Sequence, residues 1–142
     1  MRPKDRQLFD LLKVNAREPV ASLARKLGVA RTTVQERLRR LEESGAIAGY
    51  TVRLGQTAER PAITAHVLLE VNPKRADVVI RELKALAPIR GLYALSGSFD
   101  YLAIIETGST HDMDGILDRI GRLDGVAKTE TSIVLSVKFE RG

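Results

Sequence analysis

The sequence is poor in the residues that build many kinds of functional site. Its 142 residues include no cysteine and only two histidines, His66 and His111. The lack of cysteine excludes disulfides, thiol nucleophiles and cysteine-ligated zinc. No Ser-His-Asp set, phosphate-cradling glycine loop or motif-placed carboxylate pair stands out. We therefore expect no enzyme active site, no metal and no cofactor.

Long hydrophobic runs are also missing. No stretch approaches the roughly 20 apolar residues that a membrane span requires. Residues 1–6 are mostly charged or polar and lead into a short apolar patch that Lys13 interrupts, so no signal peptide is expected. A hydrophobic content of 44% supports a packed core, and the length allows one domain or two small ones. These features predict a cytoplasmic protein.

Positive charge is concentrated in the first part of the chain. The formal net charge is +5. Residues 1–60 contain 13 Lys and Arg against 7 Asp and Glu, whereas residues 61–142 contain 10 against 11. The asymmetry favours a basic module that binds a polyanion beside a nearly neutral module. The alternative is a solvated basic face, which is common on small domains.

Three helices are predicted in the first 45 residues, because apolar residues recur there at helical spacing. Asp5 is expected to cap the first helix. Gly28 and Gly45 are expected to end the second and third, since glycine accepts the positive φ of a helix C-terminus. The second and third helices cover roughly Val20 to Leu27 and Arg31 to Ser44.

The spacing of small residues indicates a helix-turn-helix motif. Ala24 is small where the third helix should cross the second, Gly28 lies in the turn, and Val34 points back into the crossing. Such a motif places its last helix in the major groove of DNA.

The exposed face of the third helix is polar at its start and rich in arginine later. This division suits DNA, because early residues of a recognition helix reach base edges and later arginines, here Arg37, Arg39 and Arg40, reach phosphates. The alternative is a solvated surface helix. The predicted DNA-binding residues are Arg31, Thr32, Thr33, Gln35, Glu36, Arg37, Arg39 and Arg40.

The rest of the chain predicts a second domain. Residues 46–54 read as a strand that makes the first domain a winged type, and residues 55–61 read as a linker. The order that follows is βαββαβ, the ferredoxin-like sandwich. The expected elements are strands 63–71, 89–95, 101–107 and 126–139, a helix from Pro73 to Ala87, and a helix capped by Ser109 or Thr110. The predicted fold class is α+β, with domains 1–54 and 62–142.

A homodimer is expected from this topology. Two helices cover only one face of a four-stranded antiparallel sheet, and the other face includes Leu68. A second copy of the sheet would cover that face.

Two blocks of residues then point to a family. One is the helix-turn-helix ending in residues 37–42, with residues 45–47 and Gly49-Tyr50 after it. The other comprises residues 95–102, with Gly125-Val126 and residues 129–131 further on. Together they resemble the Lrp/AsnC (leucine-responsive/asparagine-operon) family of feast/famine transcription regulators. The resemblance implies a DNA-binding domain, an amino-acid-sensing ferredoxin-like domain, and homodimers that often assemble into octamers.

The resemblance also implies an amino-acid effector bound between dimers, near the Ser-Gly-x-x-Asp loop. Asp100 would take the ammonium group, and Gly97 would let the backbone approach the carboxylate. The alternative is a β-turn in which Asp100 binds its own amides. The implied effector residues are Ser96, Gly97, Phe99, Asp100 and Tyr101, with Thr131, Ser132 and Ile133 as weaker candidates.

The chain departs from the family pattern at four places. Ala30-Arg31 replaces the usual Ser-Pro before the third helix, and Pro19 replaces a Ser or Thr cap. Asp124 replaces a Pro, and Ser98 replaces a frequent Asp in the signature loop. The operator preference and the effector identity are therefore not implied by the resemblance.

Two other functions stay open. Siroheme decarboxylases share this architecture and use histidine at a tetrapyrrole, but they have no use for a basic recognition helix. His66 is expected to be an interface residue and His111 a cap neighbour. An architectural DNA-binding protein would share the basic helix and the oligomer but ignore amino acids. The sequence favours a sequence-specific DNA-binding transcriptional regulator that an amino acid modulates.

Overall fold

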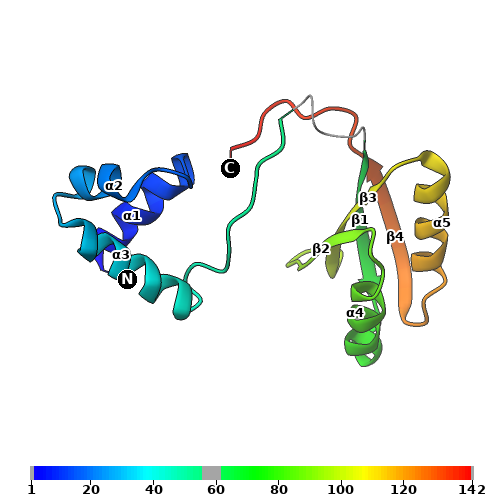
Figure 1. Cartoon of the computed structure of the whole chain (residues 1–142). Coiled ribbons are helices and arrows are strands. Elements are labelled where there is room, and N and C mark those ends of the chain that lie inside the picture. Colours follow the sequence, from blue (N-terminus) through cyan, green and yellow to red (C-terminus); the bar gives the residue numbers. More distant parts are fainter. Residues whose placement is uncertain (1, 56–61, 142) are drawn as a thin grey trace. The chain divides into compact units, whose positions relative to one another are not determined.

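The structure, a computed structural model, describes residues 2–55 and 62–141. Contacts within the chain divide it into two compact units, Met1–Arg53 and Leu54–Gly142 (Figure 1). The predicted linker 55–61 lies, from residue 56 onward, outside the described residues.

The N-terminal unit consists of three helices, α1 (Pro3–Val14), α2 (Val20–Leu27) and α3 (Arg31–Glu43). All three were predicted, but the start of α1 was wrong. The helix begins at Pro3, and Asp5 lies within its first turn, where it is buried. Proline suits the first helical position because its φ is already helical and its missing N–H would have no partner there.

The helices pack around a small apolar core, whose buried members are Leu8, Leu23, Ala24, Leu27, Val34 and Leu41. Val34 is fully buried against α2, which confirms the predicted crossing. Gly28 has a φ of +67°, and no described atom lies within 4 Å of a Cβ built there. The turn therefore requires glycine for its backbone conformation and not for space.

The strand predicted for residues 46–54 is wrong, because these residues form no strand in the described chain. Ile47 packs against the helical core, and its amide donates to Leu41 O at 2.9 Å. Tyr50, Val52 and Leu54 remain exposed. Alternating apolar residues favour a strand, but a strand also needs a partner for its backbone hydrogen bonds, and the described chain offers none here.

The C-terminal unit has the predicted βαββαβ order. Its elements are β1 (Ile63–Val71), a 3₁₀ turn (Pro73–Arg75), α4 (Ala76–Lys84), β2 (Ile89–Ala94), β3 (Tyr101–Thr107), α5 (Thr110–Gly121) and β4 (Val126–Ile133). The antiparallel sheet has the strand order β2-β3-β1-β4. Ser109 caps α5 by accepting a hydrogen bond from the amide of Asp112, as predicted.

One face of the sheet packs against both helices. Alternate residues of β1 and β3, such as Val67 and Ile105, are fully buried with Leu83 of α4 and Ile120 of α5. The opposite face carries Leu68, Leu102 and Tyr93, none of which is buried. No helix in the described residues covers this face (Figure 1).

Three elements in this unit have other bounds than predicted, and the smallest difference is that the strand expected over 89–95 ends at Ala94. The helix expected over 73–87 begins as a 3₁₀ turn and ends at Lys84. The strand expected to reach Phe139 ends at Ile133, and Leu135, Val137 and Phe139 are exposed. Ile133 pairs with Ala65, and the amide of Val134 still donates to Thr64 O at 2.8 Å. Beyond Val134 the chain passes the start of β1, which begins at Ile63.

Candidate functional site

The flank of α3 forms a polar pocket with the residue that precedes α1. The cavity of about 340 Å³ is lined by Arg2, Thr32, Thr33, Glu36, Arg37 and Arg40. The spacing of Thr33, Arg37 and Arg40 places them along one side of the helix. The structure thus brings together five of the predicted DNA-binding residues.

Arg2 was missed by sequence reasoning. It precedes α1 and lies 30 positions before Thr32, so no periodicity connects the two. The only signal in the sequence was the basic charge near the N-terminus, which does not say which residue joins the helix.

Two guanidinium nitrogens in this region lack a partner. Arg37 Nη1 and Arg40 Nε are shielded from solvent and form no hydrogen bond with the part of the chain that the structure describes. A shielded donor without an acceptor is costly, and an anionic oxygen would satisfy it. The pocket also gathers three arginines, Arg2, Arg37 and Arg40, and their positive charge suits it to a phosphate group.

Arg39, unlike Arg37 and Arg40, forms ion pairs with acidic side chains of its own helix. It forms ion pairs within α3 with Glu36 and with Glu43, the latter at 2.7 Å. Hydrogen bonding to Glu36 and then to Glu43 raises the pKa of Arg39, and Arg39 in turn lowers the pKa of Glu36. The charge of Arg39 is thus largely balanced within its own helix, unlike that of Arg37 and Arg40.

Arg31 and Gln35 lie on the other flank of α3, and both are exposed. Beyond them, the hydroxyl of Tyr50 donates to Glu42 Oε1 at 2.8 Å. Desolvation and the Glu42 carboxylate raise the pKa of Tyr50. This bond ties the segment after α3 back to the end of the helix.

The predicted effector loop lies between β2 and β3, and Asp100 is bonded at three points. Its carboxylate Oδ2 accepts from the amide of Val71 at 2.8 Å. Its own amide donates to Leu69 O, and its carbonyl accepts from the amide of Leu95. The carboxylate is therefore bonded to a neighbouring strand and not to amides of its own turn.

The two groups of effector candidates lie apart within one chain. Tyr101 pairs with Leu69, opposite Thr129 of β4, whereas Ile133 pairs with Ala65, four residues further along β1. The neighbour of the loop on β4 is instead Lys128, whose Nζ lies 5.6 Å from the centre of the Phe99 ring. Sequence reasoning did not single out Lys128.

The structure also places the two histidines and bears on the expectations about metal ions and membrane spans. His66 is exposed on the uncovered face of the sheet, and His111 is exposed in the first turn of α5. No group of three or more histidine and acidic side chains suited to a metal ion occurs within residues 2–55 and 62–141. None of the described helices is long and apolar enough to cross a membrane.

The chain matches two family models. The AsnC-type helix-turn-helix domain matches residues 3–42, and the Lrp/AsnC ligand binding domain matches residues 64–142. The HTH-type transcriptional regulator LrpA of Pyrococcus horikoshii is 32% identical over 133 residues, which cover 93% of this chain and 94% of that protein. The regulator FL11 of Pyrococcus furiosus is 29% identical over 136 residues, with 96% and 90% covered.

Solved structures share the fold. AsnC from E. coli superposes with a TM-score of 0.88 at 22% identity, covering 100% of this chain and 97% of that one. A transcriptional regulator from Neisseria meningitidis, solved as a complex with L-Met, has a TM-score of 0.85 at 18% identity, covering 99% and 93%.

Proposed function

The chain belongs to the Lrp/AsnC family of DNA-binding transcriptional regulators, and we propose from this that α3 is its recognition helix and reads a specific DNA sequence from the major groove. In this proposal the protein acts in the cytoplasm.

The observation that carries this assignment is the polar pocket in which Arg37 and Arg40 of α3 meet Arg2. Thr32 and Thr33 also line this pocket. A DNA phosphate in this pocket would satisfy both guanidinium groups and fix the helix in the groove. Of the predicted residues, Arg31 and Gln35 would then reach base edges from the other flank, Thr33 would lie beside the phosphate, and Glu36 and Arg39 lie between the two flanks.

Selection from random duplex DNA, followed by binding measurements on the selected site, tests sequence-specific recognition. Gln35→Ala should change the base preference and leave the salt dependence of binding unaltered. A protein that selects no consensus would be an architectural DNA-binding protein, and the proposal would fail.

The protein forms a homodimer through its C-terminal sheets in this proposal. Support comes from the uncovered sheet face and from the exposed apolar residues of segments 46–55 and 134–141, such as Val52 and Leu135. A dimer presents two recognition helices about 34 Å apart to a roughly palindromic site. Higher assembly, to an octamer, would bend or wrap the DNA.

Analytical ultracentrifugation tests the dimer. Tyr93→Glu places a charge on the uncovered face and should shift the protein to monomers, whereas Asp114→Asn on the exposed surface of α5 should not. Unchanged sedimentation of the Tyr93 variant would place the interface elsewhere.

A small amino acid bound near Ser96–Tyr101 modulates DNA binding in this proposal. Support comes from the match to a ligand binding domain and from the relative of the same fold solved with L-Met. Calorimetry against the proteinogenic amino acids, repeated with Asp100→Asn, tests it. If none of the amino acids gives a binding signal, the result would favour a protein that needs no effector. The relatives compared above are named transcriptional regulators, and tetrapyrrole decarboxylation is not proposed.

A further inference from the structure

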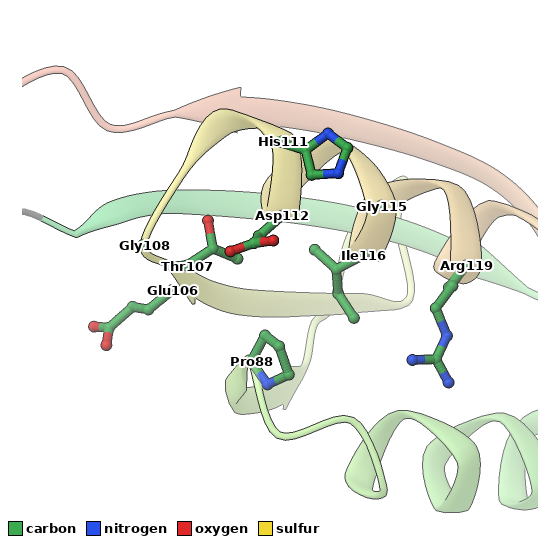
Figure 2. A pocket seen from close by; sticks show the side chains of 9 residues that line it. All are labelled: Pro88, Glu106, Thr107, Gly108, His111, Asp112, Gly115, Ile116 and Arg119. Atoms are coloured by element: carbon green, nitrogen blue, oxygen red, sulfur yellow. The ribbon is translucent and has the colours of Figure 1, made fainter.

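A second cavity lies on the C-terminal unit, away from the effector loop. This groove of about 540 Å³ lies between the connection from α4 to β2 and the first turns of α5 (Figure 2). It opens at the end of β3, whereas the 96–100 loop precedes the start of β3. The strand Tyr101–Thr107 separates the two places by roughly 20 Å, at about 3.3 Å per residue. The groove therefore belongs to a different site.

The groove carries opposite charges along one side of α5. Asp112 lies in the first turn of the helix, and Arg119 follows two turns later, about 10 Å along the axis. Ile116 lies between them and points toward Pro88 (Figure 2). Within the described chain, neither the Asp112 carboxylate nor the Arg119 guanidinium has an ion-pair partner. Glu106 at the rim, by contrast, has Arg90 Nε at 3.8 Å.

Gly115 supplies an independent indication that something binds here. It lies in the interior of α5, where glycine is less favourable than alanine. Its φ is not positive, and a Cβ built on it would meet no described atom within 4 Å. Nothing in the described part of the fold requires glycine at this position. Its lack of a side chain leaves bare backbone in the lining of the groove.

We propose that this groove binds a molecule with a carboxylate at one end, a cation at the other and a short apolar chain between them. A basic amino acid, lysine or arginine, has these groups, together with an α-ammonium beside the carboxylate. Its carboxylate pairs with Arg119 through two parallel hydrogen bonds, and its side-chain cation pairs with Asp112. The methylene groups lie over Ile116 and against the bare backbone at Gly115. The cavity volume lies in the usual range for small-molecule sites.

Isothermal calorimetry on the full chain tests the ligand class. L-lysine or L-arginine should bind saturably. L-norleucine, which lacks the terminal cation, and 1,5-diaminopentane, which lacks the carboxylate, should bind about tenfold more weakly or not at all. Equal binding of L-norleucine, or no binding of either basic amino acid, would overturn the proposal.

Variants locate the binding. Asp112→Asn and Arg119→Gln should each weaken binding about tenfold or more. Asp114→Asn and Arg81→Gln, matched changes at exposed residues outside the groove lining, should leave it unchanged. Gly115→Ala should raise the melting temperature of the free protein and weaken binding, a combination that a purely structural glycine would not show.

Asp100→Asn separates this site from the proposed effector loop. Binding of the basic amino acid should survive that substitution. Binding that is lost in Asp100→Asn but retained in Asp112→Asn and Arg119→Gln would place the ligand at the loop and refute the groove. Loss of sequence-specific DNA binding in any variant would bear on the proposed function and not on this site.

Discussion

The carboxylate of Asp100 accepts a hydrogen bond from the backbone amide of Val71, at 2.8 Å and 29 positions away in the sequence. The bond joins the loop before β3 to the end of β1. The backbone of Asp100 is bonded as well, to Leu69 and to Leu95. Asp100 therefore helps to close one end of the sheet, and any role in effector binding must use the same side chain.

Two substitutions at Asp100 should separate these roles. Asp100→Ala leaves the Val71 amide without its acceptor and should lower the free energy of unfolding by about 1–2 kcal/mol. Asp100→Asn keeps an acceptor oxygen and should cost less, while removing the charge that would bind an ammonium group. Urea unfolding measures the first effect and calorimetry the second. An Asn variant that keeps its full effector response would show that the ammonium binds elsewhere.

The arginines of α3 should differ in their effect on DNA binding. Arg40→Gln should weaken binding to all sequences and reduce the slope of log affinity against log salt by about 1, because one phosphate contact is lost. Arg39→Gln should have a smaller effect, since Glu36 and Glu43 already balance its charge. Anisotropy titrations over a range of salt measure both. Equal losses would mean that Arg39 leaves its glutamates on binding DNA.

The N-terminal unit should lose stability in acid through Glu18. Hydrogen bonds from Lys26 and then from Ser22 lower the pKa of Glu18 below its ordinary value of 4.5. A carboxyl group with a lowered pKa in the folded state stabilises the fold above its unfolded pKa, and this contribution disappears as the pH falls through the folded pKa. Glu18→Gln should therefore be less stable than the parent at pH 7 and should approach it below about pH 4.

A double-mutant cycle is the control for that assignment. Lys26→Gln alone should destabilise the protein at pH 7, and the double variant should lose less than the two single losses added together. Strict additivity in urea unfolding at pH 7 would show that the ion pair contributes nothing.

Gly125 should tolerate no side chain. Its φ is +104°, and a Cβ there would lie 2.5 Å from Cβ of Arg75. Gly125→Ala should cost about 2 kcal/mol or more, from backbone strain and from the collision. Gly121→Ala, at the end of α5 where no described atom lies within 4 Å, should be neutral or slightly stabilising. Thermal melting of the two variants measures the contrast.

Local signals explain what could be predicted of the fold. Val20–Leu27 and Tyr101–Thr107 were predicted with the boundaries that the structure has. In both, the hydrophobic periodicity and the residues that begin or end the element predict the same bounds. Gly28, for example, ends α2 with the positive φ expected of it. The order of elements, and with it the fold class, followed from the same signals.

The features of the structure that could not be predicted depend on contacts between residues far apart in the sequence. Residues 46–54 and 134–139 have the alternating apolar and polar residues of strands, yet they form no strand in the described chain. The reason is that a strand needs a neighbouring strand to pair with, which the segment's own sequence does not supply. Likewise the sequence could not separate Arg39, which is paired with two glutamates, from Arg37 and Arg40, whose shielded nitrogens have no partner among the described residues.

The sequence by itself therefore determined the three helices of the first unit, the βαββαβ order of the second and the basic character of the first, because these depend on residue types at short spacing. Only the tertiary structure decided that Arg2 joins the pocket of α3, that Asp100 bonds Val71, and that Asp112 and Arg119 share a groove with Pro88. Packing sets those relationships, since it brings together side chains that no local period connects.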